Sequence, residues 1–396
     1  MKLSHRILFF INSFSVGLMA PVLSLVLLAH GATLGTLSLC VGTYAIMVVV
    51  LEVPSGVLAD FFGRKRVFLL SCLFLIVNYF LITISKNVMV LAAACAFQGM
   101  GRALSSGTIE ALEIETYMKE QGEDKLAAIN SELAILDSIG LALGSLCGGY
   151  LGYLNPTYKL LLMICIIVQS FIFALAFSFI KEERPEGENT SFILRLKTHM
   201  QTILIRLRHS RIVMIIFMMS FLLGYGLCAI EVYWQPTLME YLPGHFNWIL
   251  GVINCLGYLG SSIGNKLAEF MWRYFQCKGS GKMFLVCYWT SRILLPFTII
   301  SLGLCRNMWM FTATYALIYM ILGISNLFEN TIFHASIENG QRASMMSMSS
   351  LFLRGGGVAS SVLSSIILLK LSLLWVWIFI PISMLGGILL LMALNK

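Results

Sequence analysis

The feature that most constrains this chain is a series of long apolar runs, each separated from the next by a polar connection. A membrane-spanning helix needs roughly 20 apolar residues, because the hydrocarbon layer is about 30 Å thick. In lipid, only helices and closed barrels satisfy their backbone hydrogen bonds. The runs are continuously apolar and too long for barrel strands of about ten alternating residues. We therefore predict an all-α membrane protein.

We predict twelve transmembrane helices from these runs. They lie near residues 6–29, 36–58, 67–84, 88–112, 127–153, 159–180, 212–239, 247–271, 283–303, 308–333, 344–369 and 372–394. Hydrophobic residues make up 58% of the chain and charged residues 12%, whereas a soluble domain carries about 25% charged residues. This composition excludes a soluble multidomain protein, and the connections are too short for a soluble catalytic domain.

Lysine and arginine are unevenly divided between the two sets of connections. With a cytoplasmic N-terminus, nineteen lie on the inner side and only Lys86, Lys159, Arg306 and Lys370 lie on the outer side. Cytoplasmic loops carry an excess of these residues, so we expect a multi-pass protein of the cytoplasmic (inner) membrane with both termini cytoplasmic. The net charge of +8 then faces the anionic inner leaflet, and no nucleic-acid partner is expected.

Neither the cysteines nor the polar motifs indicate an enzyme. The ten cysteines are scattered without a CxxC pair, a spacing that predicts neither a zinc site nor a disulfide framework. The chain has no glycine-rich phosphate loop, no His/Glu metal pair and no Ser-His-Asp set in a loop large enough for an active site. We therefore expect no metal, no cofactor and no catalytic residue.

The chain divides into two similar halves around its longest polar segment. This segment, 181–211, combines a flexible linker with a basic amphipathic stretch that predicts a helix on the cytoplasmic surface. The octapeptide at 58–65, LADFFGRK, has an echo at 267–274, LAEFMWRY, in the matching position of the second half. We therefore predict two pseudo-symmetric six-helix bundles, at 1–180 and 212–396, as in transporters that rock about a midplane site.

The connection between the second and third spans resembles the loop signature of the major facilitator superfamily, G-x-x-x-D-x-x-G-R-K/R. The matching residues are Gly56, Asp60, Gly63, Arg64 and Lys65. The resemblance implies the major facilitator fold and a conformational gate that ties the two halves together on the cytoplasmic side. Asp60 can accept helix N-terminal amides, and Gly63 permits a tight turn.

A glycine motif in the fifth span is similar to the antiporter signature of drug/proton exchangers. Its glycines are Gly140, Gly144, Gly148 and Gly149, and Ser145 stands where the signature has proline. This similarity implies a drug/proton antiporter-like branch of the family. Glycines four residues apart also let helices approach closely, so packing is the alternative explanation.

A motif of many proton-coupled exporters, R-x-x-Q-G-x-G, is incomplete in the fourth span. The chain has CAFQGMG there, so Cys95 replaces the arginine, and Arg102 follows one residue after the motif. Either Arg102 supplies the charge from another face of the helix, or the coupling differs from the family's usual scheme.

Seven charged residues inside the predicted spans are the candidates for proton coupling or charge pairing. They are Arg102, Glu110, Asp137, Glu231, Arg292, Glu329 and Arg354. An isolated charge at mid-bilayer costs about 2.5–3.5 kcal/mol on insertion scales, so we expect these side chains to pair or to face a water-filled cavity. Their depths predict one ion pair in each half, Arg102 with Asp137 and Glu329 with Arg354.

Glu110 and Glu231 lack an obvious partner at their depth, so we expect either to carry protons or to recognise a cationic group. Aromatic and polar residues are the candidates for lining a substrate pathway. They are Phe14, Tyr225, Tyr233, Trp234, Asn326 and Phe328. Aromatic walls with a few carboxylates suit amphipathic, cationic molecules, although each of these residues is also explained by packing.

The expected function is secondary active transport. We expect a monomer that exports a small amphipathic molecule in exchange for protons by alternating access, as in multidrug efflux, with the substrate, protons and membrane lipids as partners. One alternative is a dedicated metabolite carrier for a metallophore, a nucleoside or an amino-acid derivative, in either direction. The other alternative is a non-transporting membrane receptor or scaffold.

Overall fold

The computed structural model describes residues 3–106, 126–180, 211–242, 249–277, 281–335 and 342–394, with a few single positions in 107–117 and at 246 and 248. All the regular elements in these described ranges are helices, so the prediction of an all-α membrane protein is confirmed. The predicted linker and basic helix at 181–211 lie outside this part, apart from Arg211.

The chain forms two compact units. Unit 1 comprises residues 1–200 and 246–252, and unit 2 comprises residues 201–245 and 253–396. The finer division into six-helix bundles at 1–180 and 212–396 stays a prediction.

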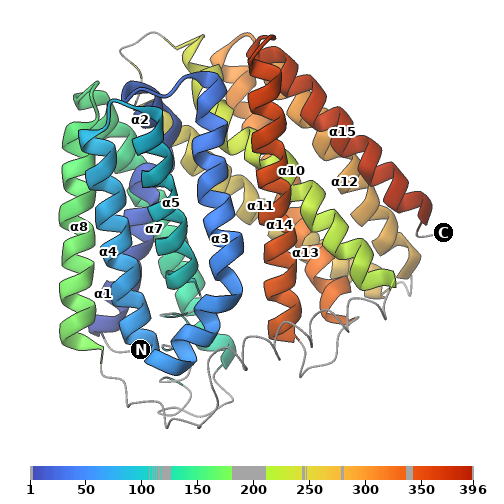
Figure 1. Ribbon diagram of the computed structural model, residues 1–396. Helices are drawn as coiled ribbons and strands as arrows, with labels where there is room; N and C mark the ends of the chain where they lie inside the picture. Colours follow the sequence, from blue (N-terminus) through green and yellow to red (C-terminus); the bar gives the residue numbers. More distant parts are fainter. Residues whose placement is uncertain are drawn as a thin grey trace. The chain divides into compact units, whose positions relative to one another are not determined.

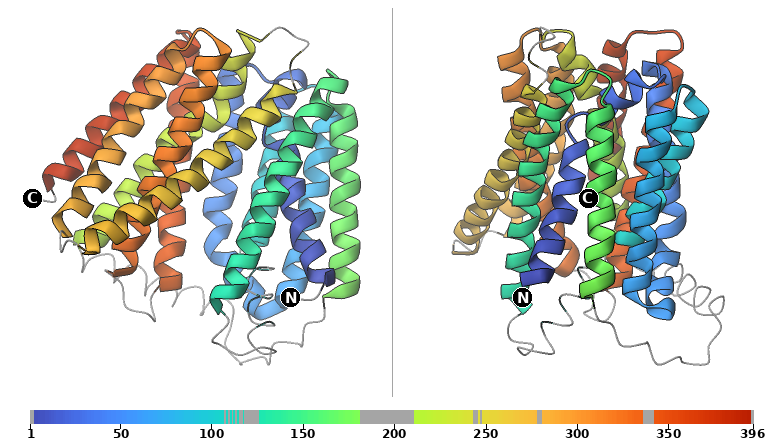
Figure 2. Two further views of the ribbon diagram at one scale, coloured as in Figure 1. Left: turned by 180° about the vertical axis from the view of Figure 1, so that it is seen from behind. Right: turned by 90° about the vertical axis from the view of Figure 1, so that its left-hand side faces the viewer.

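Unit 1 is built on helices that pack along their length. They are α1 (Leu3–Met19), α2 (Leu23–Ala29), α3 (Leu34–Phe62), α4 (Arg64–Ile84), α5 (Val88–Ser105), α7 (Leu126–Leu154) and α8 (Lys159–Phe179). Helix α4 packs against α5 and α8, and α1 packs against α7 and α8 (Figures 1 and 2). One apolar cluster joins α1, α4, α7 and α8 through buried residues such as Leu8, Phe68, Ile129 and Ile172.

Unit 2 is organised around α10. Its helices are α10 (Arg211–Met239), α11 (Ile249–Cys277) from residue 253 onward, α12 (Gly281–Leu304), α13 (Met308–Ala335), α14 (Arg342–Leu368) and α15 (Leu373–Leu394). Helix α10 packs against α14 and α15 and also contacts α12 and α13 (Figure 1). It is more buried than the other candidate membrane spans, so a polar residue on α10 calls for a structural or functional explanation.

The helices coincide with the predicted spans. Among the described residues, 10 helices are long and apolar enough to cross a membrane, and α1 with α2 make an eleventh candidate, bent by 53° at the break. Helix α11 has 29 residues but is not in this set, because polar residues such as Ser261 and Asn265 lower its hydropathy. Helix α5 ends at Ser105, before the predicted end of the fourth span.

Short polar caps start several apolar helices. At the start of α3, Thr33 Oγ1 accepts from the backbone amide of Thr36 at 3.3 Å, and Thr36 Oγ1 accepts from the amide of Thr33 at 2.8 Å. At the start of α5, Asn87 Oδ1 accepts from the amide of Met89 at 2.9 Å. Such caps satisfy the backbone donors that a helix leaves open at its first turn.

Candidate functional site

The first candidate site lies in unit 2 and centres on Glu231 of α10. Its neighbours at 229, 230 and 232–238 are buried, whereas Glu231 is exposed. Within the described residues, the Glu231 carboxylate has neither a hydrogen bond nor a contact ion pair. A helix that is otherwise packed inside its unit therefore presents one accessible and unsatisfied acid.

Arg354 of α14 lies within electrostatic range of Glu231 without forming a contact ion pair with it. The α10–α14 contact that brings them together is a close one. A Cβ atom added at Gly224 would collide with the backbone carbonyl of Leu353, and one added at Gly356 would collide with that of Phe221. The glycine run after Arg354 thus contributes a packing notch at its middle position.

Aromatic rings from α10 and α13 lie beside these charges. The ring centroids of Trp234 and Tyr315 are 4.9 Å apart, and those of Tyr315 and Tyr319 are also 4.9 Å apart. The Tyr315 hydroxyl lies 3.2 Å from Asn254 Oδ1 and 3.3 Å from the Tyr319 hydroxyl. Because an amide oxygen only accepts, Tyr315 donates its single proton to Asn254 and accepts from the Tyr319 hydroxyl. Both phenols also lie within electrostatic range of the acid.

Gly257 of α11, which has no side chain, leaves room for the two tyrosines. A Cβ atom added at Gly257 would lie 2.8 Å from Tyr315 Cε1 and 3.3 Å from Tyr319 Cδ2. The site therefore combines a carboxylate, a more distant guanidinium, an aromatic wall and a side-chain amide, contributed by four helices of unit 2. Such a set can bind an amphipathic molecule with a cationic or zwitterionic head, through charge and cation–π attraction.

A second charged cluster in unit 2 contains a buried ion pair. Arg292 of α12 and Glu329 of α13 form a buried ion pair, with side-chain exposures of 1% and 10%. The Tyr288 hydroxyl donates to Glu329 Oε2 at 2.8 Å, and the Ser220 hydroxyl lies 3.4 Å from Oε1. The predicted pairing of Glu329 with Arg354 is therefore wrong. Matching depth does not fix the direction of a side chain around its helix, and Glu329 points to α12.

The predicted pair of unit 1 is also absent from the described residues. Asp137 of α7 accepts a hydrogen bond from the Ser13 hydroxyl of α1 at 2.7 Å, while Arg102 is exposed in the last turn of α5. The ion pair that links α1 to α7 joins Arg6 to Glu132 instead. Glu110, just beyond α5, is exposed. The roles proposed for these residues in proton coupling stay predictions.

The predicted gate residues surround the turn between α3 and α4. Gly63 has φ 92°, on the side of the Ramachandran map that favours glycine, and it ends one helix and starts the next. Lys65 Nζ donates to the carbonyls of Phe177 at 2.7 Å and Ile180 at 2.6 Å, at the C-terminal end of α8. Lys65 thus caps a helix whose last carbonyls attract a cation.

The other gate residues are less constrained by the structure. Arg64 is half-buried, and the side chain of Asp60 lies outside the described part. Gly56 is exposed, and a Cβ atom added there would meet no atom within 4 Å. The turn geometry therefore requires a glycine at position 63, whereas packing within the unit does not require one at 56.

Three glycines of the α7 motif lie against α1, and Gly149 lies against Gly251 of α11. A Cβ atom at Gly140 would lie 2.8 Å from the Phe10 carbonyl. Cβ atoms at Gly144 and Gly148 would collide with backbone carbonyls of α1, and Gly149 is also buried. Close helix packing thus accounts for the spacing, and the motif does not by itself indicate antiport.

The predicted lining residues fall into different environments. Tyr225 is buried with its hydroxyl 2.9 Å from that of Ser383, and Tyr233 and Phe328 are fully buried. Phe14 is half-buried and stacks with Phe10. Of the six predicted residues, Trp234 joins the Glu231 site. Asn326 lines a separate cavity, described below.

Sequence reasoning missed Asn254, Tyr315 and Tyr319. The two tyrosines are four residues apart in one predicted span, and this spacing places them on one helix face. This spacing was the signal in the sequence, but it does not show whether that face of the helix lies toward Glu231.

The fold and the site together define a multi-span membrane protein that handles a solute. The model of the Major Facilitator Superfamily matches residues 7–273, more than half of the chain. This chain belongs to the Major Facilitator Superfamily and is a membrane transporter rather than an enzyme.

Curated relatives agree with this class. An uncharacterized MFS-type transporter of Bacillus subtilis (strain 168), YxaM, is 26% identical over 252 residues, which cover 62% of this chain and 60% of the relative. An uncharacterized transporter of Buchnera aphidicola subsp. Acyrthosiphon pisum is 26% identical over 172 residues, 43% of this chain and 44% of the relative. The chain thus aligns with about half the length of these relatives.

Solved structures show the same fold over the whole chain. The nucleoside transporter NupG has a TM-score of 0.77 at 14% identity, covering 100% of this chain and 98% of that one. A POT family transporter in complex with a thioalcohol-conjugated peptide has a TM-score of 0.73 at 13% identity, covering 99% and 95%. At these identities the likeness concerns the fold alone.

Proposed function

We propose that this transporter exports a small amphipathic molecule with a cationic or zwitterionic head across the cytoplasmic membrane, by alternating access and in exchange for protons. The observation that carries the proposal is the state of Glu231. It is an accessible acid without a contact partner in the described residues, on a helix whose neighbouring positions are buried. Such an acid can bind either a proton or a cationic group.

Competition for one carboxylate is the simplest coupling scheme. A proton that neutralises Glu231 removes the attraction for a cationic head, and a bound cation excludes the proton. The half-buried ring of Tyr319 is open to the apolar body of the cargo, and the buried rings of Tyr315 and Trp234 pack behind it. Because each ligand weakens the other, exchange follows when the site opens alternately to the two sides of the membrane.

The remaining features of the proposal concern arrangement in the membrane. We place both termini in the cytoplasm, with the segment 181–211 joining two six-helix halves in a monomer. The turn at Gly63 acts as the gate, and Asp60 and Arg64 make the contacts that open and close it. Lys65 holds the turn against the end of α8.

The test measures substrate-dependent proton movement in proteoliposomes. The full chain is reconstituted with a pH-sensitive dye inside, and amphipathic organic cations are added on one side. We expect a pH change with the wild type and none with Glu231→Gln, while Glu329→Asp, which keeps the internal ion pair, retains the pH change. Proton movement by Glu231→Gln equal to that of the wild type contradicts the assignment of the coupling acid.

A dedicated metabolite carrier is the second candidate, and Arg354 favours it. A guanidinium within range of Glu231 suits a zwitterion such as an amino-acid derivative better than a simple cation. Competition between chemically diverse cationic dyes separates the two functions, because a dedicated carrier ignores most of them. If no solute moves in the reconstituted system, a receptor or scaffold role takes the place of both.

A further inference from the structure

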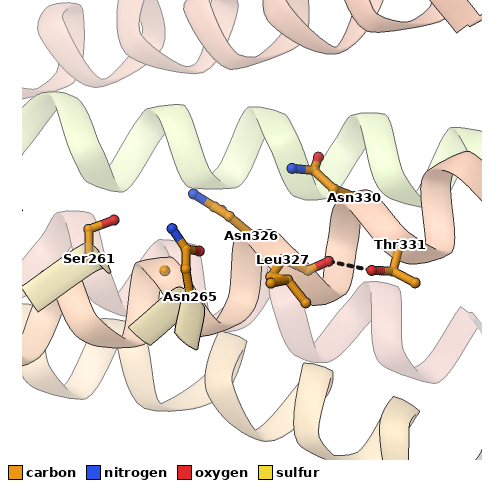
Figure 3. Close-up of a pocket in the computed structure, with 7 residues that line it drawn as sticks. Ser261, Asn265, Asn326, Leu327, Asn330 and Thr331 are labelled. Carbon is orange, nitrogen blue, oxygen red and sulfur yellow. Dashed lines mark hydrogen bonds between the residues drawn. The ribbon is translucent and has the colours of Figure 1, made fainter. Parts of the chain in front are cut away.

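A cavity in unit 2 lies between α11 and α13. It has a volume of about 350 Å³, within the range typical of small-molecule sites. Its lining residues are Ser261 and Asn265 of α11 and Gly323, Asn326, Leu327, Asn330 and Thr331 of α13. Figure 3 shows the side chains of Asn265 and Asn326 directed into the same space, with Asn330 one turn further along α13. We call this cavity the amide groove.

The groove follows from how closely the two helices cross. A Cβ atom added at Gly264 would collide with the Met320 carbonyl, and one added at Gly323 would collide with the Ser261 carbonyl. The helices therefore meet backbone to backbone at these glycines. Asn265 follows directly after Gly264, and Asn326 lies three residues after Gly323. The crossing therefore places both amides at the same edge of the contact between the two helices.

The three carboxamides of the groove are unsatisfied. Within the described residues, Asn265, Asn326 and Asn330 have no hydrogen-bond partner, whereas Thr331 donates to the Leu327 carbonyl at 2.8 Å. Each carboxamide offers two donors and one acceptor oxygen. Asn265 and Asn330 are exposed and Asn326 is half-buried, so the three amides are open to water or to a polar ligand.

The residues that line the groove carry no charge. An ionic ligand would lose its hydration there without gaining a counter-charge, and this loss is costly. A neutral molecule with neighbouring donors and acceptors can instead pair with several amides at once. Glu231 is not among the lining residues, so the groove differs in chemistry from the charged site.

We propose that the amide groove is a binding site for a neutral, polar organic group that carries hydroxyls or carboxamides. The Asn265 and Asn326 amides hold the ligand from the two helices, and Asn330 adds contacts further along α13. The site is selective by charge, because it can satisfy hydrogen bonds but cannot neutralise an ion. Binding is measurable without transport, so the test does not depend on the direction or the coupling of transport.

The test uses thiol labelling of the purified full chain in detergent. Asn330→Cys places a thiol in the groove, and Ser325→Cys places one on a fully buried position of the same helix. A water-soluble maleimide is added, and labelling is read by mass spectrometry of the peptide that carries each position. The probes are glucose, uridine and nicotinamide as neutral compounds, with choline and acetate as charged controls.

We expect Asn330→Cys to react rapidly and Ser325→Cys to stay unlabelled. At least one neutral probe slows labelling of Asn330→Cys in a saturable way, by roughly tenfold at ten times its dissociation constant. Choline and acetate leave the rate unchanged. Adding Asn326→Leu, which removes one amide at similar volume, weakens this protection.

Each of the following results would overturn the proposal. One is an Asn330→Cys thiol as slow to react as the control, because the groove would then be dry. Another is the absence of protection by all three neutral probes. The last is equal protection by choline or acetate, or protection that Asn326→Leu leaves intact, because binding would then not depend on uncharged hydrogen bonds to the amides.

Discussion

Removing the carboxylate of Glu329 should destabilise unit 2 far more than removing an exposed acid. Glu329 is the contact ion-pair partner of Arg292, a fully buried arginine, in the described residues. The Nε and Nη1 atoms of that arginine already lack hydrogen-bond partners there. Glu329→Leu would leave the whole guanidinium charged, buried and unpaired.

The magnitude follows from the number of groups left unsatisfied. Breaking a buried ion pair by removing one partner costs about 3–5 kcal/mol. The Tyr288 hydroxyl, which donates to Glu329 at 2.8 Å, also loses its acceptor, and a buried unsatisfied group costs about 1–3 kcal/mol. Together these two costs predict a loss of about 4–8 kcal/mol in the free energy of unfolding.

The assay is unfolding of the purified chain in mixed micelles with increasing dodecyl sulfate, followed by circular dichroism. The matched control is Glu269→Gln, because Glu269 pairs with Arg273 at 2.5 Å on the exposed face of α11. An exposed pair four residues apart on a helix contributes only about 0.3–0.5 kcal/mol. The double variant Arg292→Met with Glu329→Leu removes both charges and should recover most of the loss.

The double variant is the decisive comparison. If the charge left behind causes the loss, Arg292→Met with Glu329→Leu is more stable than Glu329→Leu alone. A double variant as unstable as, or less stable than, the single one would refute that cause, and so would a single variant no less stable than Glu269→Gln.

Three further predictions concern unit 1 and are checked by the same unfolding measurement. Gly148→Ala puts a methyl group against the Leu18 carbonyl, so we expect a loss of about 1–3 kcal/mol. Gly56→Ala meets no atom within 4 Å and should stabilise α3 by up to about 1 kcal/mol, while slower transport by this variant would support the proposed gate. Lys65→Ala removes two hydrogen bonds to the end of α8 and should cost about 1–2 kcal/mol, and Lys65→Arg should recover part of this loss.

The positions of the helices were predictable because lipid allows few alternatives. An apolar run of the right length becomes a helix almost regardless of its neighbours, and the polar connections mark the ends. Even the exception, α11, was predicted as a span, although polar residues such as Ser261 and Asn265 lower its hydropathy. The same two residues line the amide groove.

The side-chain pairs were not predictable because sequence position gives depth without direction. Each residue turns the helix by about 100°, since a turn holds 3.6 residues. Glu329 and Arg354 were matched by depth alone, yet Glu329 points to Arg292 of α12. Arg102 and Asp137 were matched in the same way, and Asp137 bonds to Ser13 instead. Only the packing of neighbouring helices resolves this direction.

The contrast between Glu231 and Glu329 separates stability from transport. Both are single acids on helices of unit 2, but Glu329 has three partners and Glu231 has no contact partner in the described residues. Removing an acid that is held by a cation and two hydroxyls leaves a buried charge unpaired, so Glu329 serves the fold. An accessible acid without a contact partner can meet a proton or a cationic group, as the proposed exchange requires. Glu231→Gln should therefore abolish coupled proton movement at unchanged stability, whereas Glu329→Gln should lower the free energy of unfolding even where transport survives. If both variants lose the same free energy of unfolding, the assignment of stability to Glu329 and of transport to Glu231 is wrong.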